Sequence, residues 1–287
     1  ALASKATGFP IAKIAALLAV GYTLDELQND ITTVTPASFE PVIDYIVTKV
    51  PKFNFEKFQG TPKLLNTAMK SVGEIMSIGR TFKESILKAM YSIEGDNYGF
   101  DLSHELLNLK DDILKAELKT QRPDRIILVA EAIRRNIELS DIHILTHIDI
   151  FFLREIKEII DLEKLVIKSQ DNITDDLLIS AKKMGFSNTH LASLCKIDLK
   201  EIYELLSKNN SQTVFKRVDT CGNEFDSSTA YLYSTFTNEV NKFSCEARPS
   251  DKDKIIILGS GPNRIGQGIE FDYCCVQAVK SFQKMGY

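Results

Sequence analysis

The middle of the chain is almost free of residues that break helices. Between Phe100 and Cys221 there is one proline, Pro123, and one glycine, Gly185. Leu, Ile, Lys and Glu fill this stretch, and they favour helices joined by short polar turns. Thr174 marks one helix start, because its hydroxyl can accept a hydrogen bond from the first turn, and Gly185 marks that helix's end. The sequence therefore predicts an all-helical domain here.

Residues 1–93 have a different pattern. Residues 44–50 are β-branched and aromatic enough for a strand. Thr81 and Glu84 have the spacing of a capping box, at the start of an amphipathic helix that reaches Ile93. Four prolines predict long or irregular loops around the strand: Pro36, Pro41, Pro51 and Pro62. These features predict the tail of a mixed α/β domain.

The C-terminal end of the chain predicts part of a third unit. Residues 254–259 form a short apolar run that is typical of a buried parallel strand. A glycine-rich loop follows, and then a helix that ends near Met285. This is half of a βαβ unit, and a parallel strand needs a neighbour. The predicted fold class is therefore mixed: a predominantly α-helical central domain (94–250) flanked by partial α/β segments (1–93 and 251–287).

Charge and cysteine content exclude several classes of protein. The chain has 35 Lys and Arg against 39 Asp and Glu, which gives no electrostatic reason to expect nucleic acid or an anionic membrane as partner. Five irregularly spaced cysteines argue against a disulfide framework and favour a reducing, cytoplasmic compartment. No C-x-x-C pair is present, and Ile144 stands where a metalloprotease helix needs a Glu after His143. We therefore expect no metal site.

The glycine loop at residues 259–268 fits neither of two standard phosphate-binding motifs. Arg264 occupies the position of the third glycine of a dinucleotide fingerprint. Gln267 and Gly268 replace the Lys and hydroxyl residue of a P-loop. Two interpretations remain open: the backbone amides at the following helix start bind an anion, or the glycines only permit a tight turn.

The residues around this loop resemble a known family. The run from Gly261 to Cys275, with its Pro-Asn-Arg and Cys-Cys features, is similar to the start of the second synthetase half of the carbamoyl-phosphate synthetase large chain. The run from Ala1 to Pro10 resembles the segment that follows the metal-binding Glu and Asn of that family's first ATP-grasp unit. Further similarities occur at residues 36–41, 44–45, 70–74, 79–81, 148–153 and 216–221. Because the first residue is not Met and both ends resemble internal segments, we expect a piece of a longer protein.

The resemblance implies an activity for the intact family enzyme. It makes carbamoyl phosphate, for pyrimidine and arginine synthesis, from bicarbonate, two ATP and ammonia that a small glutaminase subunit releases from glutamine. Each phosphoryl transfer needs ATP and Mg²⁺ (or Mn²⁺), held by carboxylates and cationic groups. The resemblance assigns those groups to positions outside residues 1–287. The chain is therefore expected to link the carboxyphosphate and carbamoyl-phosphate halves of this carbon–nitrogen ligase, to bind no cofactor and to be inactive alone.

The resemblance also implies a tunnel, through which carbamate passes between the two halves. Its wall is implied to include Ala1, Met69, Gly259, Ser260 and Gly261. An adaptable Met side chain suits a passage wall, although core packing is the commoner role of a Met. Ser260 departs from the run of glycines that the family pattern leads us to expect.

Two polar residues are expected to support the glycine loop. Arg264 and Glu270 flank the start of the predicted helix, where such a pair would hold the loop in place. Exposure to solvent is the alternative for each of them.

The helical block resembles the family's oligomerisation domain, and we expect it to self-associate. Its helices carry more apolar surface than one small domain hides easily, with Phe151, Phe152, Ile156 and Ile159 as examples. Two rival interpretations stand beside this one. The chain could be a stand-alone helical assembly module, or a fragment of a dinucleotide-binding oxidoreductase that uses the glycine loop.

Overall fold

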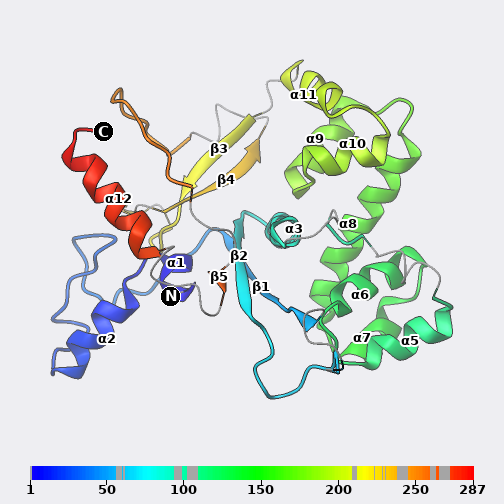
Figure 1. Cartoon of the computed structure of the whole chain (residues 1–287), viewed down its shortest axis with the longest axis horizontal. Helices are drawn as coiled ribbons and strands as arrows, with labels where there is room; N and C mark the ends of the chain where they lie inside the picture. The colour runs from blue at the N-terminus through cyan, green and yellow to red at the C-terminus, as the bar shows by residue number, and fades with distance from the viewer. Residues whose placement is uncertain are drawn as a thin grey trace.

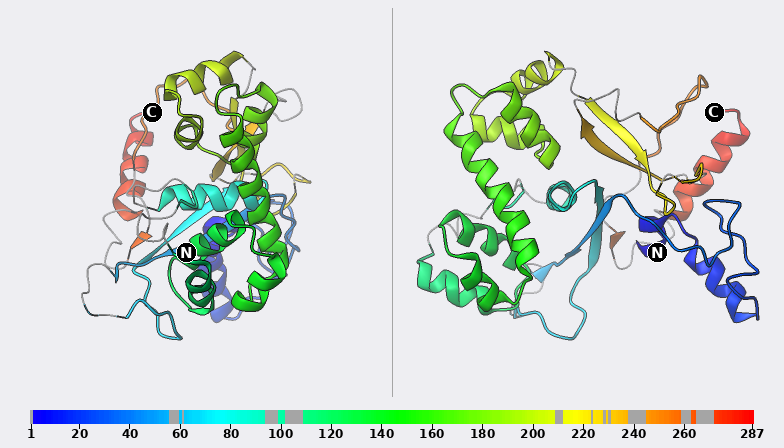
Figure 2. Two further views of the ribbon diagram at one scale, coloured as in Figure 1. Left: turned by 90° about the vertical axis from the view of Figure 1, so that its right-hand side faces the viewer. Right: turned by 180° about the vertical axis from the view of Figure 1, so that it is seen from behind.

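The computed structural model describes residues 2–55, 60, 62–93, 99–101, 109–208, 212–222, 224–227, 229, 231–237, 245–258, 263–264 and 272–287. In this part of the chain, helices α5 to α11 gather on one side of the molecule (Figure 1). Two small sheets lie in the middle, and α2 and α12 lie on the opposite side, as the view from behind also shows (Figure 2). The predicted fold class, mixed and mostly helical, is confirmed.

The first sheet joins the two ends of the chain. Its strand order is β1 (Ile46–Lys52), β2 (Gly73–Gly79) and β5 (Asn263–Arg264), and both pairings are antiparallel. The strand predicted at residues 44–50 is confirmed, shifted by two residues. It includes Pro51, which is tolerated because β1 is an edge strand of the described sheet. Helices α1 (Leu2–Thr7) and α2 (Ile11–Ala19) precede this sheet.

Helix α3 (Phe82–Ser92) lies between the first sheet and the helical bundle (Figure 1). Thr81 caps it as predicted, because its hydroxyl accepts a hydrogen bond from the Glu84 amide at 3.2 Å. On the bundle side, Leu87 and Met90 join the main hydrophobic core. The helix therefore packs on the sheet with one face and on the bundle with another.

The bundle confirms the helical prediction for most of the middle of the chain. Thr174 and Gly185 delimit a helix as expected, with Gly185 in the left-handed conformation. One continuous core of aliphatic side chains runs through the bundle. Its helices are α5 (Asp111–Lys119), α6 (Arg125–Arg134), α7 (Leu139–Thr146), α8 (Ile150–Lys168), α9 (Asp175–Met184), α10 (Asn188–Cys195) and α11 (Leu199–Lys208).

The prediction that helices continue to Cys221 is wrong. Residues 212–237 contain a second sheet, the antiparallel hairpin of β3 (Gln212–Arg217) and β4 (Leu232–Thr237). In β4 the buried residues Tyr233, Thr235 and Thr237 alternate with more exposed neighbours, which is the period-two pattern of a half-buried strand. Absence of Pro and Gly in β3 does not favour a helix when the residues are β-branched or aromatic.

The strand predicted at residues 254–259 is not present over residues 254–258, the described part of it. Residues 254–258 make no ladder with another strand, and Ile256 and Leu258 are 83% and 88% exposed. A buried parallel strand needs neighbours on both sides, and the described residues supply none at this segment. The helix that follows is confirmed as α12 (Asp272–Lys284). No helix in the described ranges combines the length and the apolar character that crossing a bilayer requires.

Candidate functional site

The glycine loop is attached to the first sheet through β5. Gly73 pairs with Arg264 and Glu74 pairs with Asn263, so two residues of the loop extend the β1–β2 sheet by backbone pairing. The chain segments involved are about 190 residues apart in sequence, since Arg264 follows Gly73 by 191 positions. The pairing therefore brings residues 263–264 of the C-terminal segment directly against strand β2.

Most of the predicted tunnel residues lie outside the described residues. This applies to Ala1, Gly259, Ser260 and Gly261, which the prediction placed in the wall. Met69 is described and is 78% exposed, four residues before β2 begins. Core packing of Met69, the alternative interpretation, is therefore wrong for this structure.

The two loop-supporting residues have different outcomes. Glu270 lies outside the described residues. Arg264 is described through its backbone, in β5, where it pairs with Gly73. This pairing brings Arg264 close in the fold to the segment that carries Met69.

The segment after Ala1 is fixed against the sheets. The Tyr45 hydroxyl donates a hydrogen bond to the Ala6 carbonyl at 2.7 Å, and burial raises the pKa of Tyr45 above its usual range. Gly8 has a φ of +72°, and a Cβ there would lie 2.9 Å from the Val218 carbonyl oxygen. Helix α1 thus lies between the start of β1 and the chain that follows β3.

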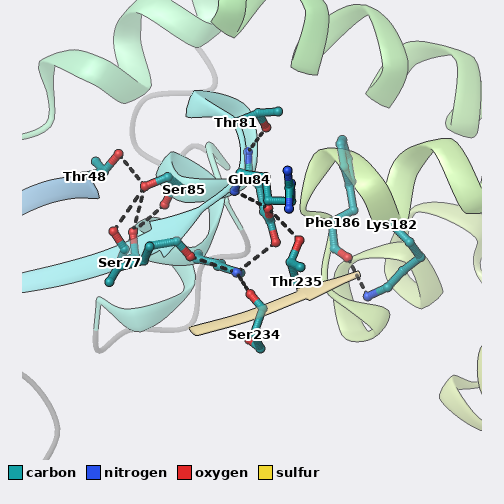
Figure 3. A network of polar contacts seen from close by, with 12 residues as sticks. Thr48, Ser77, Thr81, Glu84, Ser85, Lys182, Phe186, Ser234 and Thr235 are labelled. Carbon is teal, nitrogen blue, oxygen red and sulfur yellow. Dashed lines mark hydrogen bonds and ion pairs between the residues drawn. The ribbon is translucent and has the colours of Figure 1, made fainter. Parts of the chain in front are cut away.

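A buried carboxylate connects α3 to both sheets (Figure 3). Glu84 is 3% exposed, and its Oε2 accepts hydrogen bonds from the Arg80 amide at 2.8 Å and the Thr235 hydroxyl at 3.1 Å. Its Oε1 forms an ion pair with Lys88 at 2.9 Å. The Lys88 ammonium also donates to the carbonyls of Ile78, at 2.9 Å, and Ser234. We call Glu84, Lys88 and Thr235 the junction network.

A second set of hydroxyls lies beside the junction network (Figure 3). The Ser77 hydroxyl donates to the Ser85 carbonyl at 2.5 Å, and the Ser85 hydroxyl donates to Thr48 at 2.7 Å. These bonds join α3 to β2 and β1 on the side away from β4. The Ser77, Ser85 and Glu84 side chains each bond to another element, so these bonds position α3 against the two sheets.

Lys182 approaches the same junction from α9. Its ammonium donates to the Phe186 carbonyl at 2.9 Å and lies 5.6 Å from the centre of the Phe236 ring of β4. Burial lowers the pKa of Lys182 to about 8. Its neighbour Gly185 has a φ of +109°, and a Cβ there would lie 2.8 Å from the Glu84 Cα, so glycine permits the close approach of α9 and α3.

The lowered pKa of Lys182 predicts a specific dependence of stability on pH. Between about pH 8 and the ordinary pKa of lysine, the unfolded chain binds a proton that the folded chain does not. The free energy of unfolding should therefore rise with pH across this window in the wild type, relative to a Lys182→Met variant. Denaturant unfolding of both proteins between pH 7 and 10 measures the difference. If the free energy of unfolding changed with pH in the same way in both proteins, the assigned environment of Lys182 would be wrong.

One cluster of possible metal ligands lies inside the bundle. Carboxylate oxygens of Asp101 and Glu163 and a ring nitrogen of His190 lie within 4.8 Å of one another. Arg134 already donates to both oxygens of Glu163, at 2.7 and 3.0 Å, and the Tyr91 hydroxyl bonds His190 Nδ1 at 3.1 Å. The guanidinium supplies the positive charge that a metal would bring, so we interpret the cluster as a buried ion-pair network.

The apolar residues expected to drive self-association separate into two groups. Ile156 and Ile159 are 0% and 1% exposed and belong to the bundle core, so the expectation that they face a partner is wrong. Phe151 and Phe152 are 52% and 41% exposed. The helical period explains the difference, because positions 156 and 159 fall on the core face with Leu153.

Sequence reasoning identified only part of the junction network. Glu84 was predicted as a capping residue, but its carboxylate reaches the Arg80 amide and Thr235, a residue 151 positions away. Thr235, and Lys182 which approaches the network from α9, carry no local motif. Their only signals were a polar residue on a strand-like pattern and a Lys just before a helix-ending Gly.

Two family profiles match the chain. The carbamoyl-phosphate synthetase large chain, oligomerisation domain, matches residues 74–210, and the carbamoyl phosphate synthase preATP-grasp domain matches residues 251–287. The first match begins at Glu74 in β2 and includes α3 and the whole described bundle. The second contains the glycine loop and α12.

Curated relatives are similar over the whole chain. The carbamoyl phosphate synthase large chains of Pseudomonas aeruginosa and Vibrio parahaemolyticus are each 52% identical to it, and that of Buchnera aphidicola is 53% identical. Each alignment covers 100% of this chain and 27%, 26% and 26% of the respective relative. The chain thus spans about a quarter of the length of the relatives it matches.

Proposed function

Because this chain belongs to the carbamoyl phosphate synthase large-chain family, we propose that it is the part of the large chain that connects the two synthetase halves. The observation that carries the proposal is the β2–β5 pairing, which attaches the glycine loop to the sheet of the first block. The similarity of both ends of the chain to internal parts of longer relatives agrees with a connecting role.

The proposed domains are residues 1–93, the tail of the first ATP-grasp unit; 94–250, the helical oligomerisation domain; and 251–287, the start of the second half. Helix α3, at the end of the first of these, supplies Leu87 and Met90 to the core of the second. The first two parts therefore share a core, which suits a rigid connector.

The intact protein is proposed to make carbamoyl phosphate from bicarbonate, ammonia and two ATP, with Mg²⁺ or Mn²⁺ at the phosphates. A small glutaminase subunit would supply the ammonia, and the product would enter pyrimidine and arginine synthesis. Cytoplasmic location is supported by the five cysteines, all of which are free thiols. Carbamate is proposed to travel through a tunnel whose wall includes Met69 and the glycine loop. Arg264 and Glu270 are proposed to hold this loop in place.

Self-association through the helical domain is the second part of the proposed function. The observation that favours it is the match of residues 74–210 to a domain described as an oligomerisation domain. The match of residues 251–287 to a preATP-grasp domain argues against the oxidoreductase interpretation of the glycine loop.

The chain of 287 residues should not synthesise carbamoyl phosphate by itself. The family resemblance assigns the ligands of both ATP sites to other parts of the large chain, and phosphoryl transfer fails without metal and phosphate ligands. The chain would be incubated with MgATP, bicarbonate and ammonia, and the product trapped chemically. Product above the level of a no-enzyme control would contradict the proposed connector role, since the chain would then hold a complete site.

A further inference from the structure

Three phenylalanines form an exposed patch where α3 meets the start of α8. The rings of Phe82 and Phe152 are 5.1 Å apart, and those of Phe151 and Phe152 are 5.3 Å apart in an edge-to-face arrangement. Phe151 is 52% exposed, Phe152 is 41% exposed and Phe82 is half-buried. We call these three residues the aromatic patch.

Phe151 and Phe152 of the aromatic patch lie off the core face of α8. Leu153, Ile156 and Ile159 complete the bundle core, whereas the first turn of α8 directs two large rings to the surface. Rings that hold one another in place lose little conformational entropy when a partner covers them. Aromatic side chains, Phe included, are enriched in the buried core of protein–protein interfaces.

The charges beside the patch are of both signs. Lys83 forms ion pairs with Glu155 at 3.3 Å and Glu158 at 2.6 Å, and Arg154 is exposed on the next turn of α8. A partner with a single sign of charge, such as nucleic acid, would meet repulsion from half of this rim. A second copy of the same surface, turned by a two-fold axis, can place each acidic group against a basic group.

We propose that the aromatic patch is the centre of the interface through which a second copy of this chain binds. The inference rests on the proposed self-association of the helical domain and identifies the face that carries it. A stable interface buries roughly 800 Å² on each partner, more than three partly covered rings provide. The charged rim on α3 and α8 therefore belongs to the interface as well.

The test is a pair of matched substitutions in the chain of 287 residues. Phe151→Glu introduces a charge at the centre of the patch, and Leu165→Glu makes the same change near the other end of α8. Both wild-type residues are 52% exposed, and both face away from the core. Glu in the first turn of α8 is compatible with folding, because a negative charge there interacts favourably with the helix dipole. Circular dichroism and thermal unfolding would verify that both variants are folded.

Sedimentation and light scattering over a range of concentrations would measure self-association. Phe151→Glu should raise the dissociation constant by about 30-fold or more, as expected for a residue at the centre of an interface, and Leu165→Glu should change it by less than about threefold. Equal effects of the two variants, or none, would overturn the assignment of the patch while leaving self-association intact. A wild-type chain that stays monomeric at every concentration would instead overturn the proposed self-association, and the patch with it.

Discussion

Replacing Gly261 with Phe in the intact large chain should abolish carbamoyl phosphate synthesis while each half keeps its own chemistry. If Gly261 lines the path of carbamate, a benzyl group closes the path without touching the ligands of either ATP site. Bicarbonate-dependent ATP hydrolysis in the first half should persist. So should ATP formation from ADP and added carbamoyl phosphate in the second half. The measurement is the rate of overall synthesis divided by the rate of each partial reaction. This ratio should fall by at least about 100-fold if nearly all carbamate is blocked, which corresponds to an increase of about 2.7 kcal/mol in the effective barrier to overall synthesis.

A structural role for Gly261 predicts a different result. A glycine needed for a tight turn cannot be replaced even by Ala without strain, whereas a methyl group barely narrows a passage. Gly261→Ala should therefore leave overall synthesis close to wild type. If Gly261→Ala alone removes the partial reaction of the second half, the glycine is structural and the tunnel role is wrong. Gly261 lies outside the described residues, so these kinetics are the direct test.

Local signals were enough to predict the helices. The Thr174 cap and the Gly185 stop act within one turn of their own helix, and the structure has both where the sequence predicts them. The strand at β1 was predictable for the same reason, because β-branched residues favour extended backbone before any partner is known. Helix starts and stops depend on neighbours four residues away, which a single sequence contains.

Pairing between distant segments was not predictable. The apolar run at residues 254–258 has the composition of a strand, but a strand exists only if a neighbour pairs with it. Conversely, Asn263 and Arg264 have no strand-like composition, yet they pair with Glu74 and Gly73. The sequence motif located the glycine loop, and the tertiary structure decided which two of its residues extend the sheet.

In the candidate site, too, residues with a local motif were predicted and residues with distant partners were missed. The predicted residue Met69 is exposed, and its place in a passage wall stays a prediction. The junction network was missed, because it joins Glu84 to Thr235 across most of the bundle sequence. Polar residues with distant partners have no periodic signature, so a buried carboxylate such as Glu84 resembles an ordinary capping residue in the sequence.

Removing the carboxylate of Glu84 should be among the most destabilising single changes in the chain. Glu84→Ala would leave the partly buried Lys88 ammonium without its acid, and it would leave the Arg80 amide and the Thr235 hydroxyl without their acceptor. Breaking a buried ion pair by removing one partner costs about 3–5 kcal/mol, because the remaining charge is no longer compensated. Guanidinium unfolding followed by circular dichroism would show this as a large fall in the transition midpoint.

Two further variants separate the junction network from a general effect of losing an ion pair. Lys13→Ala breaks the pair with Asp30, whose side chains are 57% and 41% exposed, and should cost less than about 1 kcal/mol. Thr235→Val keeps the shape of the side chain and removes one donor to Glu84, so it should cost about 1 kcal/mol. If Glu84→Ala costs no more than Lys13→Ala, the carboxylate does not hold α3 to β2 and β4. If the predicted order is observed, the attachment of α3 to both sheets depends on Glu84, and the position of the bundle relative to the sheet that carries the glycine loop depends on it too.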